Sequence, residues 1–251
     1  ILVVEDHLPN QKVISAMLKK LGYQDAVAAN GEEALQLLSN TSFDIVLMDC
    51  QMPEKDGYQT TREIRESNEN YSRIPIIALT ADAMEGTKEK CLNAGMNAYL
   101  TKPVQIQDLA KILSDWSQKD IRANTRQTAQ ENGQKHPENT SESLIDWDYA
   151  YQLLDGDDEL LQISIDSFTN SAEEYLQDLQ KAIQDENSYD IRRLAHTIKS
   201  GLKSFGAFEI ADLAYKIEEE ARKNELSQTA KDFSSLEGKV RQVVLEIQKK
   251  D

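Results

Sequence analysis

The stretch FDIVLMDC, residues 43–50, decides the fold of the first half of this chain. It is a nearly continuous apolar run that ends in an acidic residue, Asp49. A second run of the same kind, IPIIAL, occupies residues 74–79. Runs of this length and composition are typical of strands that are covered on both faces, as in the centre of a parallel sheet. The two runs therefore predict two central strands.

Three further short runs rich in β-branched residues flank these two strands. They are ILVV (residues 1–4), DAVAA (residues 25–29) and NAYL (residues 97–100). Longer stretches with helical periodicity separate all five runs. Alternating strands and helices are typical of βα units around a parallel sheet. Residues 1–118 are therefore predicted to form a doubly wound α/β domain with a five-stranded parallel sheet.

The composition changes in the next segment and changes again after it. Residues 119–143, KDIRANTRQTAQENGQKHPENTSES, contain almost nothing to bury and predict a flexible linker. As a coil, this linker would span roughly 25–30 Å. Residues 144–251 have helical periodicity throughout, with apolar seams at four-and-three spacing. These residues predict an all-α four-helix bundle with a short leading helix at about residues 147–154.

Charge and composition restrict the classes of function. The 251 residues have a formal net charge of −16, which argues against general nucleic-acid binding or attraction to an anionic membrane. No apolar run approaches the roughly 18 residues of a membrane span, and two cysteines suit a reducing compartment. The chain starts with Ile1 inside an apolar run, so we expect a piece of a longer protein. We expect these domains to be cytoplasmic, whether or not the parent protein is anchored in the inner membrane.

Carboxylates follow two of the predicted strands. Glu5 and Asp6 come directly after the first run, and Asp49 ends the third. Because ligands bind beyond the carboxyl ends of parallel strands, we expect these three acids to lie together. Like charges at close range favour a bound cation, and oxygen ligands suit Mg²⁺. This edge of the sheet is therefore a candidate magnesium site.

A hydroxyl and an ammonium group are predicted at the same edge. Thr80 ends the fourth strand, and Lys102 follows the fifth. A carboxylate such as Asp49 can attack phosphorus to form an acyl phosphate, while cationic and hydroxyl groups stabilise the phosphoryl oxygens. Each of these residues alone is common at strand ends. Their joint placement indicates phosphoryl transfer.

Four segments carry a resemblance to a known family. VVED, VLMDCQMPEKDGYQTTREIR, PIIALTADA and YLTKP resemble the receiver domain of two-component response regulators, in the form found in hybrid sensor kinases. The resemblance covers residues 1–118 and implies a flavodoxin-like fold. It also implies that Asp49 is the phosphoacceptor. The implied Mg²⁺ ligands are Glu5, Asp6, Asp49 and the backbone carbonyl of Gln51.

The same resemblance implies roles for three residues around the phosphoacceptor. Thr80 and Lys102 would contact the phosphoryl group, and Tyr99 would be an aromatic switch that turns inward when Thr80 moves. One position departs from the family, which often has Asn or Asp where His7 stands here. Two interpretations of His7 remain open: a substitution that tunes the site, or an exposed loop residue with no role.

A histidine stands in the helical segment RRLAHTIKSGLKSF, residues 192–205. At about 100° per residue, His196 lies roughly 145° from the centre of the apolar stripe and is predicted to face solvent. Lys199 and Lys203 follow it by one and two turns. These cations would disfavour the imidazolium and would receive an arriving phosphoryl group. The small residues Ser200 and Gly201 would leave room for a loop of another protein.

The segment AHTIKSGLKSFGA, followed by EIADLAYKIEEEAR, resembles a histidine phosphotransfer (HPt) domain. Lys199, Gly206 and Ala207 fit the family pattern, whereas Ser200 stands where Gly is usual. The resemblance covers residue 144 to the end. It implies that His196 is transiently phosphorylated and that Lys199 orients the phosphate.

Two hypotheses of function follow, from different classes. In the first, the chain is the C-terminal part of a hybrid sensor histidine kinase and acts as a phosphorelay carrier. A histidine kinase domain of the same or a separate chain would phosphorylate Asp49, and His196 would exchange phosphate with a downstream response regulator. This stretch contains no kinase core. In the second, the chain is a phosphorylation-gated interaction module whose bundle only docks partners. A phosphatase is disfavoured, because Gln51 replaces the second Asp of such enzymes.

Overall fold

The computed structural model describes residues 1–53, 55–81, 85–117 and 143–249. The chain divides into two compact units, Ile1–Pro137 and Glu138–Asp251. Apart from Ser143, the predicted linker at residues 119–143 lies outside the described residues. The domain boundaries at residues 118 and 144 therefore stay predictions.

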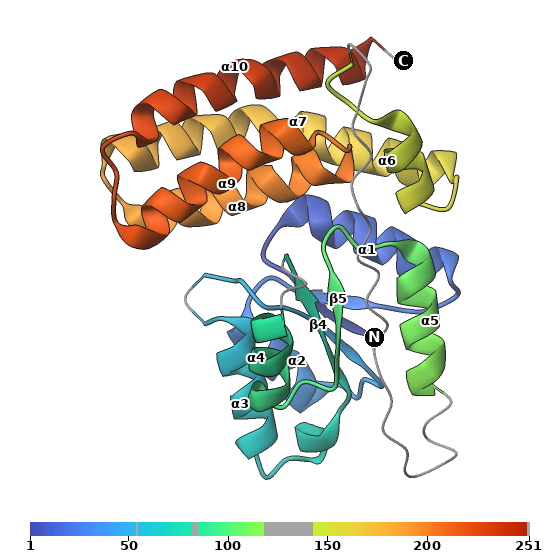
Figure 1. The fold of residues 1–251 in the computed structure, drawn as a ribbon. Helices are drawn as coiled ribbons and strands as arrows, with labels where there is room; N and C mark the ends of the chain where they lie inside the picture. Colours follow the sequence, from blue (N-terminus) through green and yellow to red (C-terminus); the bar gives the residue numbers. More distant parts are fainter. Residues whose placement is uncertain (54, 82–84, 118–142, 250–251) are drawn as a thin grey trace. The chain divides into compact units, whose positions relative to one another are not determined.

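The first unit is built on a five-stranded parallel sheet with strand order β2-β1-β3-β4-β5 (Figure 1). The strands are β1 (Leu2–Val4), β2 (Ala26–Ala28), β3 (Val46–Asp49), β4 (Ile76–Thr80) and β5 (Ala98–Thr101). Every residue of β1, β3 and β4 is buried, whereas the edge strands β2 and β5 are only partly buried. The predicted doubly wound α/β fold is confirmed, and the two long apolar runs form central strands.

Five α-helices connect and cover this sheet: α1 (Leu8–Lys20), α2 (Gly31–Asn40), α3 (Gly57–Glu66), α4 (Glu85–Ala94) and α5 (Ile106–Ser117). A 3-10 turn, η1 (Asn70–Arg73), precedes β4. The chain runs from β1 outward to β2 in one direction and then steps through β3, β4 and β5 in the other. Right-handed crossovers therefore place α1 on one face and α2, α3 and α4 on the other. Figure 1 shows α5 on the side of the sheet opposite α2, α3 and α4.

Helix α3 starts unusually close to the end of β3. A Cβ atom built on Gly57 would lie 2.1 Å from the backbone oxygen of Asp49. The side chain of Asp56 caps this helix by accepting a hydrogen bond of 2.7 Å from the backbone N–H of Gln59. Glycine at this position thus lets the helix begin immediately beside the acidic strand end.

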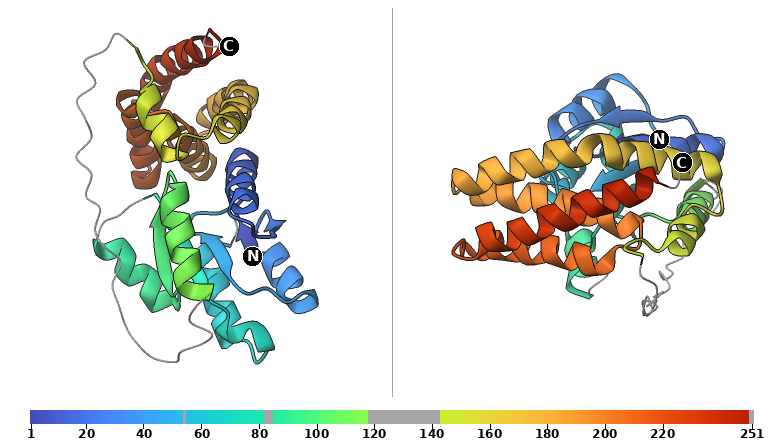
Figure 2. Two further views of the ribbon diagram at one scale, coloured as in Figure 1. Left: turned by 90° about the vertical axis from the view of Figure 1, so that its right-hand side faces the viewer. Right: turned by 90° about the horizontal axis from the view of Figure 1, so that it is seen from above.

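The second unit consists of helices only: α6 (Trp147–Leu153), α7 (Asp158–Gln184), α8 (Ser188–Ser204), α9 (Phe208–Lys223) and α10 (Thr229–Gln248). Helix α8 packs against α7 and α9, and α10 packs against the same two helices, so the four long helices enclose one core (Figure 2). The predicted four-helix bundle and its short leading helix are confirmed. The apolar seam of α10 is wholly buried and consists of Phe233, Leu236, Val240, Val243 and Ile247. The corresponding seam of α7 is partly exposed at Phe168, Tyr175 and Ile183.

A tight turn joins α8 to α9 and anchors α6. Gly206 has a φ of 65°, and a Cβ atom built on it would lie 2.6 Å from the Cβ of Asp146. The backbone N–H of Asp146 donates a 3.0 Å hydrogen bond to the carbonyl of Phe205. The buried Phe205 ring packs against Phe168 of α7, with ring centroids 5.3 Å apart. The left-handed backbone conformation and the close approach both require glycine here.

Among the described residues, no helix has the length and apolar character needed to cross a membrane.

Candidate functional site

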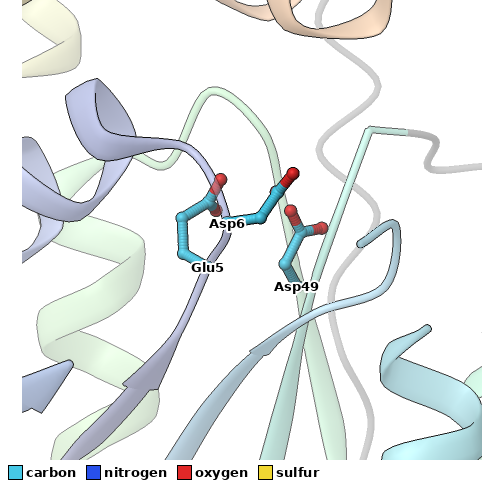
Figure 3. A group of neighbouring side chains, drawn as sticks. All are labelled: Glu5, Asp6 and Asp49. Atoms are coloured by element: carbon cyan, nitrogen blue, oxygen red, sulfur yellow. The ribbon is translucent and has the colours of Figure 1, made fainter. Parts of the chain in front are cut away.

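Three carboxylates converge at the carboxyl ends of β1 and β3 (Figure 3). Val4 of β1 pairs with Met48 of β3, which brings the next residues, Glu5 and Asp49, level with each other. One oxygen each from Glu5, Asp6 and Asp49 lies within 4.8 Å of the others. β1 and β3 are also the strands between which the chain reverses its direction across the sheet, where open α/β sheets bind ligands.

Lys102 joins two of these carboxylates. Its Nζ donates hydrogen bonds of 2.7 Å to Oε2 of Glu5 and to Oδ2 of Asp49, and its side chain is only 6% exposed. The other oxygen of Asp49, Oδ1, accepts a hydrogen bond of 3.0 Å from the backbone N–H of Gln51. A charged group from the end of β5 is thus held directly against the predicted phosphoacceptor.

Burial dominates the electrostatics of this site. It raises the pKa of Asp49 to about 6, with a further contribution from the charge of Glu5, while Lys102 and the Gln51 N–H oppose the shift. Burial acts to lower the pKa of Lys102, but the attraction of Asp49 and Glu5 is stronger and raises it above its ordinary value. Three carboxylates facing one ammonium leave an excess of negative charge. Oxygen donors with excess negative charge fit a hard divalent cation such as Mg²⁺.

The other predicted residues of this edge lie close to the carboxylates in the sheet. Thr80 is the buried last residue of β4, one position beyond Leu79, which pairs with Asp49. Its carbonyl accepts a hydrogen bond of 2.7 Å from the backbone N–H of Lys102. Tyr99 in β5 is partly buried and packs against the core of the sheet.

His7 is not an exposed loop residue. It is the N-cap residue of α1 and is only 9% exposed, so that interpretation is wrong. Its position next to Asp6 leaves the interpretation as a tuning substitution in place.

A second polar cluster lies between α8 and α9 of the helical unit. The Nδ1 atom of His196 is 2.9 Å from Oε1 of Glu218, and Nζ of Lys199 donates a 2.5 Å hydrogen bond to Oε2 of the same carboxylate. Lys199 also lies 5.2 Å from the ring centroid of Tyr215. One buried carboxylate therefore holds both the histidine and the lysine.

His196 is less exposed than predicted, and Lys199 beside it is buried. Their side chains are only 12% and 7% exposed. The predicted exposure assumes a helix that packs along a single apolar stripe. In the structure, α8 packs against both α7 and α9. Residues far from the centre of the stripe are therefore still partly covered by a neighbouring helix.

Two further expectations about the neighbourhood of His196 are corrected. Gly201 does not make room for another protein, because a Cβ atom built there would lie 2.7 Å from the Phe168 ring of α7. Ser200 is buried as well. Nor is the charge around the ring uniformly positive, since Glu218 contacts His196 directly.

Glu218 is ionised at neutral pH. Burial would raise its pKa, but the hydrogen bonds and charges of His196 and Lys199 outweigh burial and lower the pKa to about 2. An ionised carboxylate only accepts hydrogen bonds, so Nδ1 of His196 must be the donor. In the neutral ring, the lone pair is then on Nε2.

The sequence analysis missed Glu218, although its pattern contained a signal. Glu218 follows Ala214 by four residues and precedes Ala221 by three, so it lies on the apolar face of α9. A carboxylate on the buried face of a helix indicates a buried cationic or hydrogen-bonding partner.

Two family models match the chain, one in each compact unit. Residues 1–114 match the family model of the response regulator receiver domain, and residues 164–248 match that of the Hpt domain. Residues 1–114 are therefore a receiver domain, and residues 164–248 are an Hpt domain. Asp49 and its neighbours belong to the receiver domain, and His196, Lys199 and Glu218 belong to the Hpt domain.

Curated relatives of this receiver–Hpt chain include hybrid and sensor kinases. It is 39% identical over 119 residues to the sensor histidine kinase RcsC of Escherichia coli (47% of this chain, 12% of the relative). It is 39% identical over 119 residues to the sensor protein GacS of Pseudomonas syringae (47% and 13%). It is 42% identical over 124 residues to the hybrid signal transduction protein dokA of Dictyostelium discoideum (49% and 7%). The chain thus spans a small part of the length of these relatives.

Solved structures similar to this chain include a receiver domain and a complex that contains one. One is the receiver domain of sensor histidine kinase PA1611 from Pseudomonas aeruginosa, solved with a magnesium ion in its active site cleft. It is 50% identical to this chain, with a TM-score of 0.43, and the match covers 46% of this chain and 93% of that chain. The complex of Ypd1 with the Ssk1 receiver domain from Saccharomyces cerevisiae gives 31% identity, 47% and 88% coverage, and a TM-score of 0.44. Receiver and Hpt domains together in one chain support a two-component phosphorelay role.

Proposed function

We propose that the chain carries phosphoryl groups in a two-component phosphorelay, with Asp49 and His196 as its two acceptors. The observation that carries this proposal is the pairing of each nucleophile with a buried lysine. Lys102 contacts Asp49 directly, and Lys199 shares the carboxylate of Glu218 with His196. In both domains, a fixed cation is thus available for the charge of a transferred phosphoryl group.

In the receiver domain, a carboxylate oxygen of Asp49 attacks the phosphorus of a phosphohistidine. A P–O bond forms, the P–N bond breaks, and the donor imidazole leaves. Lys102 and the hydroxyl of Thr80 bind the phosphoryl oxygens, and Tyr99 responds to the movement of Thr80. Glu5, Asp6, Asp49 and the backbone carbonyl of Gln51 would hold Mg²⁺. When bound, this ion neutralises negative charge on the transferred group.

In the Hpt domain, Nε2 of His196 is the attacking atom. Glu218 accepts the Nδ1 hydrogen, which orients the ring and stabilises the positive charge that develops as Nε2 bonds to phosphorus. Lys199 orients the phosphate from its place beside the ring. Glu218 is therefore a positioning residue for His196.

The partners follow from this chemistry. The donor to Asp49 is a histidine kinase domain, on the same polypeptide as these domains or on a separate one. His196 exchanges phosphate with the aspartate of a receiver, in this chain or in a downstream response regulator. We place these domains in the cytoplasm, where both kinds of partner act.

The test supplies the whole chain with Mg²⁺ and acetyl phosphate and maps phosphate by mass spectrometry under conditions that preserve acyl and phosphoramidate bonds. We expect phosphate on Asp49, and on His196 only when Asp49 is intact. The variants Asp49→Ala and His196→Gln are the controls. If Asp49 stays unmodified in folded protein with Mg²⁺ bound, the receiver part of the proposal is overturned.

A second assay separates a carrier from a docking module. A purified response regulator receiver is added to chain phosphorylated on His196. Transfer from wild type and none from His196→Gln is the expected result. Equal phosphorylation of the regulator by both proteins would show that the bundle only docks its partner.

A further inference from the structure

The only two cysteines of the chain lie against each other. Cys50 follows Asp49 at the end of β3, Cys91 belongs to α4, and their Sγ atoms are 4.0 Å apart across a sequence separation of 41 residues. Both residues are only 2% exposed. Neither thiol takes part in the phosphoryl transfer described above, so their juxtaposition needs a separate explanation.

The two sides of this pair differ in how firmly they are held. The backbone N–H of Cys50 donates a 3.0 Å hydrogen bond to the carbonyl of Leu79, and the carbonyl of Cys50 accepts one of 3.3 Å from Gly57. In contrast, only Cys91 and Ala94 are buried among the described side chains of α4 (residues 86–94), and Leu92 is 53% exposed. A helix that buries so little apolar surface opens locally at low free-energy cost, which exposes Cys91 to small reagents.

Cys91 lies on the sparsely buried helix α4, which a small reagent reaches more easily than the strand end that carries Cys50, and its electrostatic surroundings favour the same sulfur. A hydrogen bond from the Cys50 thiol lowers the pKa of Cys91 to about 7, with help from the Tyr58 hydroxyl and against the effect of burial. Since the thiolate is the nucleophile in cysteine oxidation, Cys91 reacts first and Cys50 is placed to resolve the product.

We propose that Cys50 and Cys91 are a modification site, at which a hydroperoxide converts the two thiols into a reversible disulfide. The Cys91 sulfur attacks the peroxide, the O–O bond breaks, and a sulfenic acid forms together with an alcohol or water. The Cys50 thiol then attacks the Cys91 sulfur, the S–O bond breaks, and water leaves. Overall, two thiols and one hydroperoxide yield one disulfide, one alcohol or water, and one water.

The bond would couple the oxidation state to the phosphoacceptor site. The sulfurs must approach from 4.0 Å to about 2.05 Å. Because backbone hydrogen bonds to Leu79 and Gly57 hold Cys50 just after β3, α4 is the element that moves. α4 follows β4 in the chain, so the disulfide restrains the end of β4, where Thr80 lies beside Asp49, and phosphorylation of Asp49 slows. This consequence rests on the proposed function, whereas formation of the disulfide does not.

The first experiment treats the whole chain with hydrogen peroxide, blocks remaining thiols with iodoacetamide, and maps peptides by mass spectrometry. We expect a linked peptide pair containing Cys50 and Cys91 within one chain, which dithiothreitol separates again. Oxidation of Cys91 only to sulfinic acid, cross-linking between chains, or no reaction under conditions that oxidise a surface thiol would each overturn the proposal.

Two single variants test the order of the steps. In Cys50→Ser, dimedone is expected to trap a sulfenic acid on Cys91, because the resolving thiol is gone. In Cys91→Ser, Cys50 is expected to form no such adduct at the same peroxide concentration. Equal trapping in both variants, each with the circular dichroism spectrum of wild type, would overturn the assignment of Cys91 as the attacking sulfur.

A final measurement separates this inference from the proposed function. Phosphorylation of Asp49 by acetyl phosphate is compared in reduced chain, oxidised chain and the Cys50→Ser/Cys91→Ser double variant. We expect severalfold slower uptake only in oxidised wild type, with recovery after dithiothreitol. Equal rates with the disulfide in place would overturn the coupling alone. Absence of phosphorylation in the reduced chain would instead count against the proposed function.

Discussion

His196 and Glu218 lie 22 residues apart on two helices of the Hpt domain, and a 2.9 Å hydrogen bond joins Nδ1 of the ring to Oε1 of the carboxylate. This contact assigns the tautomer of the histidine, because an ionised carboxylate can only accept. Oε2 of the same carboxylate also accepts a hydrogen bond from Lys199. The proposed phosphoacceptor His196 and the ammonium of Lys199 are thus held by one carboxylate.

Replacing Glu218 should slow phosphorylation of His196 more than it affects the fold. Glu218→Gln keeps an acceptor but removes the charge, and a charge-assisted hydrogen bond contributes about 1.5–3 kcal/mol. We therefore expect transfer to His196 to slow by roughly tenfold or more. Rapid-quench measurements give the rate, and ¹⁵N NMR of the imidazole reports whether the Nδ1–H tautomer still predominates.

The neighbouring variant Glu219→Gln is the matched control. Glu219 pairs with Arg222, whereas the carboxylate that contacts the His196 ring is that of Glu218, so transfer should stay at the wild-type rate. Slowing by Glu218→Gln with an unchanged tautomer ratio would point to a structural defect and against positioning.

The stability of the Hpt domain should fall in mild acid. The pKa of Glu218 is lowered from 4.5 to about 2 in the folded protein. A group with a depressed folded pKa contributes its full stability above pH 4.5 and loses it as the pH falls towards 2. The full loss, on the order of 3 kcal/mol, is reached only near pH 2, and about 2 kcal/mol of it has appeared by about pH 3. Urea unfolding between pH 6 and about 3, followed by Trp147 fluorescence in a Trp116→Phe background, measures it.

The pH dependence should be markedly flatter in Glu218→Gln, since the amide does not titrate. If this variant loses stability as steeply as wild type, other carboxylates are responsible for the acid sensitivity.

Removing the ammonium of the receiver site should destabilise the receiver domain. Lys102→Met leaves Glu5 and Asp49 buried without their shared cation, and breaking a buried ion pair in this way costs about 3–5 kcal/mol. Mg²⁺ should recover part of the loss, because the ion replaces the missing positive charge. Thermal unfolding with and without Mg²⁺ tests both statements. The exposed Lys12→Met serves as the control and should change neither value.

Asp6 should matter for magnesium and little for the Lys102 ion pairs. Its carboxylate belongs to the acidic cluster, while Lys102 forms its ion pairs with Glu5 and Asp49. Asp6→Asn removes one negative charge from a site for a doubly charged ion, so we expect Mg²⁺ affinity to fall by about tenfold or more. Isothermal titration calorimetry measures the affinity. Unchanged Mg²⁺ binding in folded Asp6→Asn would exclude Asp6 as a ligand.

Two glycines of the Hpt domain should respond in opposite directions to alanine. Gly206→Ala introduces a Cβ atom at a φ of 65° and 2.6 Å from the Cβ of Asp146, which should destabilise the domain by about 1–3 kcal/mol. Gly238→Ala lies inside α10, where nothing is within 4 Å of the new atom, and should stabilise it by about 0.5–1 kcal/mol. Urea unfolding of both variants provides the comparison. Equal effects would contradict the role assigned to the turn.

The structure corrected the sequence analysis mainly where two elements meet. Apolar runs predicted all five strands, and the acids at strand ends indicated the acidic edge, because β-sheet connectivity brings carboxyl ends together. His196 is less exposed than predicted, because the angular positions of residues around one helix carry no information about which neighbouring helices flank it. The prediction that Gly201 leaves room for a loop of another protein is wrong for the same reason, because Gly201 packs against Phe168 of a neighbouring helix.

The sequence by itself determined the periodicity of each element, the order of strands and helices, and the presence of acids, a hydroxyl and a lysine after successive strands. These properties depend on residues that are neighbours in the chain. Only the tertiary structure decided that Glu218 holds His196, that Lys102 bridges Glu5 and Asp49, and that Cys50 lies against Cys91. Such contacts join residues far apart in sequence, and they depend on how helices and strands pack, which no local pattern specifies.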